Sequence, residues 1–478
     1  MIFTSAEFLL FFLVSYPAYL LLRRRSWPAA KLLLLVASLL CYSAWYYPYT
    51  AILLAIIAVD FTVGLVLERI ERPLWRRAVL AGSICANLGL LGLFKYSQFA
   101  AEQLAVLLAL AGVTVTLGET GWLLPLGISF HTFQGMSYTL DIYKRRARAH
   151  GSLADFALYV AFFPQLVAGP IVRARNFLPQ LAKVPRILPA TWYWGAFLVI
   201  LGSFKKLVVA DNLAPYVDWF FALPSYETVH GLTAVYAMLA YSVQIYSDFS
   251  GYSDIAVGLA AMLGFRFPYN FYYPYIALGF SDFWRRWHIT LSEWIRDYVY
   301  VPLGGSRVGP SRTVVNLTLT MGLAGLWHGA SWLFVAWGLL HGLFLVLDHL
   351  VLQRWVLPRC GFASPSGVAW SLGTRAVTFA LVTLAWLLFR GQSWQQVTDI
   401  LAAAVTHHGG GYDQATQFRM AQYWVIPLLM HLAVLLRFGD RLHRRFGRGV
   451  LLAAACLMSL AILFFKAVDT NAFIYFAF

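Results

Sequence analysis

The chain has 478 residues, of which 60% are hydrophobic and 12% are charged, and its mean hydropathy is +0.67. A soluble domain carries about a quarter of charged residues, so this composition excludes both an ordinary soluble protein and a disordered one. The formal net charge of +15 comes from Lys and Arg in short clusters between apolar runs. That spacing favours loops beside a membrane and argues against nucleic acid as a partner. The sequence therefore predicts an all-α, polytopic integral membrane protein with membrane lipid around it.

Apolar runs long enough to form spanning helices recur along the whole chain. A span needs about 20 mostly apolar residues, and we expect about eleven spans in a single domain over residues 1–478. Two of the runs are long enough to hold two elements each. The runs lie near 4–22, 30–47, 50–68, 78–97, 121–142, 153–170, 191–222, 230–263, 313–352, 367–390, 421–437 and 449–467.

The connectors between these runs alternate in charge. Connectors 43–50 and 95–121 are almost bare of charged residues, whereas Lys and Arg gather in 23–31, 69–77, 144–148 and 437–448. Since basic loops stay on the cytoplasmic side, we expect both chain ends on the outer side of the membrane.

Polar side chains interrupt the run 230–263. Gln244 and Asp248 lie four residues apart, and Asp254 follows within the same segment. On a helix, Gln244, Asp248 and Gly251 share one face, which must look into protein or water rather than lipid. Two interpretations stay open at this point: hydrogen bonds that hold helices together, or the lining of a functional cavity.

The segment 281–297 is predicted to be one helix with Trp284, His288, Leu291 and Ile295 on a single face. Trp and Arg at such spacing are typical of an interfacial helix. His288 does not fit that interpretation, because it lies on the apolar side and an imidazole can carry a proton near neutral pH.

Two further histidines lie inside apolar runs. His328 is surrounded by Gly and Ala, and small neighbours allow a substrate or another backbone to approach the ring. Taken alone, such a histidine is more often a helix-packing hydrogen bonder. His131 is undecided between packing and lining a cavity. The four cysteines have no metal-ligand spacing, so no metal site is expected.

Seven motifs, in order along most of the chain, resemble the membrane-bound O-acyltransferase superfamily, in particular its bacterial branch that acetylates exported alginate. They are Phe94–Phe99, Pro125–Phe130, Ser137–Tyr143, Phe163–Arg173, Ser247–Gly258, Asp282–His288 and Gly325–Gly329.

The resemblance implies a ring of helices around a central funnel that reaches a buried catalytic histidine, His328, with His288 as a second histidine near it. Trp327 and Gly329 are then expected beside the cavity. Cations at the inner mouth would bind the phosphates of the donor, although positive-inside anchoring explains them equally well. The candidates are Lys205, Lys206, Arg285, Arg286 and Arg296.

The resemblance further implies an O-acetyltransferase of the bacterial inner membrane with both termini in the periplasm. It would move acetyl from acetyl-CoA or another cytoplasmic thioester, with no bound cofactor, to a periplasmic partner acetyltransferase or directly to a polysaccharide within an export complex. Peptidoglycan or cellulose are alternatives to alginate. A proton-coupled transporter or flippase and a non-catalytic scaffold are competing hypotheses, since intramembrane Asp and His also suit transport.

Overall fold

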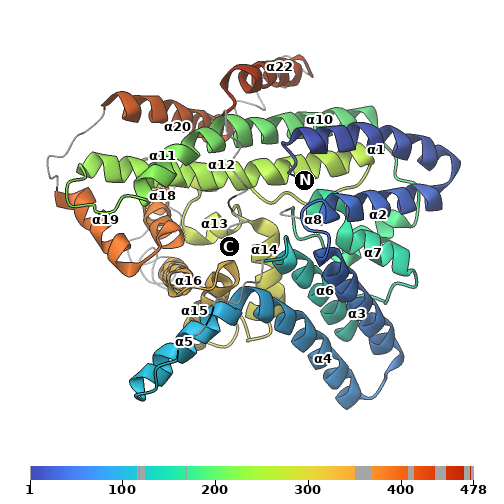
Figure 1. The fold of residues 1–478 in the computed structure, drawn as a ribbon. Coiled ribbons are helices and arrows are strands. Elements are labelled where there is room, and N and C mark those ends of the chain that lie inside the picture. Colours follow the sequence, from blue (N-terminus) through green and yellow to red (C-terminus); the bar gives the residue numbers. More distant parts are fainter. Residues whose placement is uncertain are drawn as a thin grey trace. The chain divides into compact units, whose positions relative to one another are not determined.

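The computed structural model describes residues 2–115, 118, 124–166, 169–349, 368–406, 414–435, 448–467 and 474, and throughout these ranges the regular structure is helical (Figure 1). The prediction of an all-α membrane protein is therefore confirmed. In these ranges, six helices are long and apolar enough to cross a membrane, and three shorter apolar helices accompany them. The six are Ala6–Arg25, Tyr49–Arg69, Pro73–Leu110, Pro189–Phe221, Trp332–His349 and Ala369–Arg390.

The chain divides into two compact units, which are described separately. The first comprises residues 1–196 and 256–268, and the second comprises 197–255 and 269–478. Two of the three boundaries fall inside α10 (Pro189–Phe204) and α12 (Gly231–Leu263), and the third follows Pro268 in the loop after α12. A single domain over 1–478 stays a prediction. The basic connector 437–448, on which the placement of the C-terminus depends, lies outside the described residues apart from its last position.

The first unit consists of helices, several of which are joined by short connections. Ser26 ends one helix and begins the next, because its side chain accepts a hydrogen bond from the Ala29 N–H and so caps the second helix. The helices are α1 (Ala6–Arg25), α2 (Trp27–Ser43), α3 (Tyr49–Arg69), α4 (Pro73–Leu91), η1 (Gly92–Tyr96), α5 (Ser97–Leu110), α6 (Ile128–Tyr143), α7 (Leu153–Ala161), α8 (Phe163–Leu166) and α9 (Ala174–Leu181).

The apolar run 153–170 was predicted as a span, and the structure corrects this. It forms two short helices, α7 and α8, separated at Phe162, and every residue from Asp155 to Leu166 is buried. Pro164 lacks an N–H to continue the helical ladder, and the Phe163 N–H donates instead to Ser38 Oγ at 3.1 Å. The run is apolar because it is surrounded by protein, not because it faces lipid.

The second unit contains an aromatic core that includes Trp287, Trp337 and Trp386, all at most 1% exposed. The run 313–352 holds two helices, as expected, and they pack beside each other (Figure 1). Besides parts of α10 and α12, the unit contains η2 (Lys205–Ala210), α11 (Asp211–Phe221), η3 (Pro274–Ile276), α13 (Phe280–Trp284), α14 (Ile289–Ile295), η4 (Arg296–Tyr300), α15 (Pro310–His328), α16 (Trp332–Val346), α18 (Val368–Arg390), α19 (Trp394–Thr406), α20 (Gln414–Leu435) and α22 (Arg448–Phe465).

Candidate functional site

The hairpin of α15 and α16 positions His328. The two helices touch backbone to backbone, since a Cβ added to Gly338 would lie 2.2 Å from the Met321 carbonyl oxygen and 3.0 Å from the Cα of Gly325. Small residues permit this approach, as in other membrane helix pairs. His328 is the last residue of α15, and Ser331 caps α16 by accepting a hydrogen bond from the Leu333 N–H. The turn between the helices is therefore short and fixed.

Three aromatic rings surround the His328 imidazole, which is 3% exposed. The centroid of Trp337 lies 5.1 Å from it at an interplanar angle of 90°, that of Phe389 at 5.2 Å and 70°, and that of Trp327 at 4.9 Å and 74°. Such edge-to-face contacts are a preferred geometry for aromatic pairs and fix the orientation of the ring. Gly329, next in the chain, is extended, and a Cβ there would lie 2.1 Å from the Phe334 ring.

His288 lies at a break between two short helices, which corrects the predicted continuous helix over 281–297. α13 ends at Trp284, α14 begins at Ile289, and His288 has left-handed backbone angles of φ 41° and ψ 54°. Left-handed geometry is uncommon for a residue other than glycine and persists only where surrounding contacts hold it. The predicted helix face is thereby interrupted, and the His288 side chain is fully buried.

Asn270 holds the His288 ring in one tautomer. The amide oxygen of Asn270 lies 3.1 Å from His288 Nδ1, and it also accepts from the Thr290 backbone N–H at 3.2 Å and from Thr290 Oγ1 at 2.9 Å. Since an amide oxygen only accepts, this network assigns the proton to Nδ1 and the lone pair to Nε2. Burial lowers the pKa of His288 to about 3, so the ring is neutral at physiological pH.

One indole connects the two histidines. The Trp327 ring lies 4.9 Å from His328 and 6.2 Å from His288, measured between centroids. Phe249 of α12 packs edge-to-face on His288 at 4.7 Å. The structure therefore brings His288, Trp327 and His328 into one buried aromatic neighbourhood, although 39 residues separate Trp327 from His288 in the chain.

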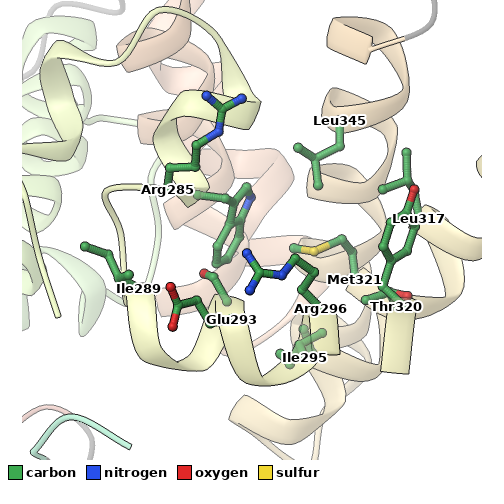
Figure 2. A pocket seen from close by; sticks show the side chains of 13 residues that line it. Arg285, Ile289, Glu293, Ile295, Arg296, Leu317, Thr320, Met321 and Leu345 are labelled. Atoms are coloured by element: carbon green, nitrogen blue, oxygen red, sulfur yellow. The ribbon is translucent and has the colours of Figure 1, made fainter. Parts of the chain in front are cut away.

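A cavity of about 260 Å³ extends along α15 beside this neighbourhood (Figure 2). Its α15 wall includes Leu317, Met321 and Ala324, which share a helix face with His328 at steps of four, three and four residues. The opposite wall includes Ile289, which directly follows His288. The remaining lining residues are Trp284, Arg285, Ser292, Glu293, Ile295, Arg296, Tyr300, Thr320 and Leu345.

The structure separates the five basic residues that were predicted to bind donor phosphates. Arg285 and Arg296 line the cavity of Figure 2, and Arg296 also pairs with Asp297 at 2.8 Å. Arg286 is engaged outside that lining, where its Nε lies 3.0 Å from Asp282.

The two lysines lie in the helical core. Lys206 Nζ lies 2.7 Å from Asp211 and 2.9 Å from Asp248, and Lys205 Nζ lies 2.7 Å from Asp254. Cations already paired with carboxylates are not positioned to bind a phosphate, so this placement argues against the prediction for Lys205 and Lys206. It favours the helix-holding interpretation of Asp248 and Asp254.

The two remaining candidates are also buried side chains. Gln244 of α12 is 6% exposed, and its amide oxygen has no hydrogen-bond partner in the described part of the chain. His131 belongs to α6 of the first unit and is 1% exposed.

Three residues at the site were not identified from the sequence. Asn270 lies in an aromatic-rich loop 18 positions before His288, and only its polarity among aromatic neighbours distinguishes it. Trp337 and Phe389, which enclose His328, belong to helices whose composition is apolar throughout. Long-range packing alone identifies these residues.

Comparisons with known proteins agree on one family. A model of the MBOAT, membrane-bound O-acyltransferase family matches residues 131–370. A probable alginate O-acetylase AlgI of Azotobacter vinelandii is 36% identical over 444 residues, which cover 92% of this chain and 85% of that relative. A peptidoglycan O-acetyltransferase of Helicobacter pylori is 35% identical over 79% of this chain and 74% of the relative. A teichoic acid D-alanyltransferase of Streptococcus thermophilus is 27% identical over 59% of this chain and 72% of the relative.

Proposed function

Since the chain belongs to the membrane-bound O-acyltransferase family and is an acyltransferase, we propose that it moves an acetyl group from a cytoplasmic thioester to a hydroxyl on an exported polysaccharide. Acetyl-CoA is the proposed donor and alginate the proposed polymer, reached directly or through a periplasmic partner protein. The chain would lie in the bacterial inner membrane. The observation that carries the proposal is the burial of two histidines around one indole, beside a cavity lined by arginines.

His328 is proposed as the general base. It takes the proton from the acceptor hydroxyl while that oxygen attacks the carbonyl carbon of the thioester, and a tetrahedral oxyanion forms. The C–S bond then breaks, the thiolate leaves, and the proton held on the imidazole passes to the sulfur. Three edge-on aromatic rings support this role, because they hold the imidazole in one orientation and exclude water.

His288 is proposed to accept a hydrogen bond or a proton rather than to donate one. Its Nδ1 proton is directed at Asn270, so Nε2 presents the lone pair. A neutral ring in this tautomer can orient the acceptor hydroxyl or relay its proton. Donation to the oxyanion from Nε2 would need a second proton, which burial disfavours.

Donor binding is proposed at the cavity of Figure 2, where Arg285 and Arg296 provide guanidinium groups, Glu293 and the Asp297 partner of Arg296 offset part of their charge, and the α15 wall is apolar apart from Thr320. Phosphates of a nucleotide-bearing thioester suit guanidinium groups, which bind them through paired N–H donors. The apolar wall along Leu317, Met321 and Ala324 leads along the helix face toward His328. His288, Trp327 and His328 do not line this cavity, so the proposal requires the acyl end of the donor to pass beyond Ala324 to reach His328.

The test uses the purified full chain in detergent with acetyl-CoA and alginate oligosaccharides, and free thiol release is followed. His328→Ala is expected to lower turnover by about 10²- to 10⁴-fold, the usual contribution of a general base. The control is His230→Asn, which keeps the side-chain acceptor that caps α12 at the Leu232 N–H. Normal turnover in folded His328→Ala protein would refute the assignment, and absence of any thiol release by the wild type would favour transport.

The acceptor needs a separate measurement, because the relatives include both an alginate O-acetylase and a peptidoglycan O-acetyltransferase. Acetyl esters on exported alginate and on peptidoglycan can be quantified by mass spectrometry in cells with and without the chain. Loss of esters from alginate alone is expected, and loss from peptidoglycan alone would replace the proposed polymer.

A further inference from the structure

A second cavity, of about 380 Å³, lies between α12, α18 and α20, and its walls are almost entirely aliphatic and aromatic. None of the residues proposed for acyl transfer lines it. Two of its lining residues, Leu372 and Leu428, are more than half exposed, so the cavity opens to the surroundings of the helices. For a membrane helix bundle those surroundings are lipid.

Arg375 is the cation of this cavity and lies within a candidate membrane span, Ala369–Arg390. Its Nε donates to the Ile276 carbonyl oxygen at 3.0 Å, and Nη1 donates to the Ser371 carbonyl oxygen at 3.0 Å. Among the described residues it has no carboxylate partner. A guanidinium inside a span is costly unless an anion or water meets it, so a cation at this place points to an anionic group of a ligand.

Pro427 shapes the opposite wall. A proline inside a helix removes one ladder hydrogen bond and displaces the preceding turn, which makes room in the face of α20. His431, one turn later, is 3% exposed and donates from Nδ1 to the Pro427 carbonyl oxygen at 2.7 Å. Its Nε2 therefore carries a lone pair, and this atom has no hydrogen-bond partner in the described ranges. The cavity thus combines an apolar body with a cation and a buried acceptor.

We propose that this cavity binds an anionic membrane phospholipid, with one acyl chain among α12, α18 and α20 and the phosphate at Arg375. The chemistry favours a lipid over a nucleotide-bearing thioester, because one guanidinium and an aliphatic wall do not match several phosphates. The acyl chain gains little over bulk lipid, which is equally apolar. Selectivity therefore comes from the charge of the headgroup. The proposal is independent of the acyl-transfer mechanism.

The test measures lipid binding to the purified full chain by native mass spectrometry and thermal unfolding, with phosphatidylglycerol, phosphatidylcholine and inorganic phosphate as separate probes. Phosphatidylglycerol is expected to bind and to raise the unfolding temperature, whereas phosphatidylcholine binds more weakly and phosphate alone has no effect. Arg375→Gln is expected to weaken phosphatidylglycerol binding about fivefold, the usual contribution of one basic residue to an anionic lipid. Arg312→Gln, at an exposed arginine of α15, is the matched control.

Ala376→Phe provides a second variant, since it fills the cavity and leaves Arg375 in place. It is expected to reduce phosphatidylglycerol binding without changing the preference over phosphatidylcholine. Equal binding of the two lipids by the wild type, an effect of phosphate alone as large as that of the lipid, or unchanged lipid binding in both variants would each overturn the proposal.

Discussion

Substitution of Asn270 tests whether the tautomer of His288 matters for turnover. In Asn270→Ala, three hydrogen bonds to one amide oxygen are lost, at 3.1, 3.2 and 2.9 Å. At about 1 kcal/mol net for each bond, the loss of unfolding free energy is about 3 kcal/mol. His288 then loses both the acceptor for Nδ1–H and the support of its left-handed backbone. We expect turnover to fall about 10- to 100-fold through misorientation of the ring.

Asn270→Asp separates orientation from charge. A carboxylate oxygen still accepts from Nδ1, so turnover near neutral pH is expected to recover relative to Asn270→Ala. The negative charge also favours the imidazolium, which raises the pKa of His288 from its value of about 3. Because the neutral ring is the proposed active form, the acid limb of the pH profile of kcat/KM moves to higher pH.

The pH dependence of the unfolding free energy tests the pKa of His288 independently of turnover. In the wild type, His288 becomes protonated near its ordinary pKa of about 6.5 in the unfolded chain but stays neutral in the folded chain. The contribution of His288 to the unfolding free energy therefore falls as the pH drops below 6.5. In Asn270→Asp the two pKa values lie closer together and the loss is smaller.

Asn316→Ala is the control for these variants, since it removes a buried asparagine that donates to the Gly305 carbonyl oxygen at 2.9 Å. Reduced stability with an unchanged acid limb is expected. If Asn270→Ala matched wild-type turnover, or if the acid limb of Asn270→Asp stayed in place, the assignment of His288 would be refuted.

Two further substitutions test the scaffold. Gly338→Ala would place a methyl group 2.2 Å from a carbonyl oxygen of the facing helix, so we expect a lower unfolding temperature and lower turnover. The control Gly373→Ala, whose added Cβ meets nothing within 4 Å, is expected to leave both unchanged. Equal unfolding temperatures of the two variants would disprove the close packing. Lys206→Met leaves the Asp211 and Asp248 carboxylates without their shared cation, so a loss of about 3–5 kcal/mol of unfolding free energy is expected. Its KM for the thioester should match the wild type, and a raised KM in a fully stable variant would restore the phosphate-binding prediction.

The sequence predicted the class of fold because membrane helices are specified locally. About 20 apolar residues suffice to define a span, and the division of the run 313–352 into two helices follows from the polar and glycine residues at its centre. The same local reasoning predicted a span over 153–170 and was wrong. Hydropathy does not distinguish burial in protein from burial in lipid, and the hydrogen bond from Phe163 to Ser38 joins positions 125 residues apart.

At the site, sequence reasoning identified side chains but not their surroundings. His288 was assigned to a continuous helix face because its neighbours have helical spacing. The break occurs because Asn270, 18 positions earlier, holds the imidazole and Thr290 together. Lys205 and Lys206 were predicted as candidate phosphate-binding cations at the inner mouth, whereas the structure pairs them with carboxylates of another helix. In both cases the decisive partner is distant in the chain.

Polar residues inside apolar runs therefore belong to two physical classes in the second unit. Lys206 lies between Asp211 and Asp248, so its ammonium group is already engaged by two carboxylates, and such a cluster holds helices together without offering a cation to an anionic ligand. His288 and His328 are instead enclosed by aromatic rings that offer no charge to neutralise them. Burial lowers the pKa of His288 to about 3, and a neutral ring with the lone pair on Nε2 is the state that a proton acceptor needs. The residues that surround a buried polar side chain, and not its residue type, therefore determine whether it holds helices together or is available for proton transfer.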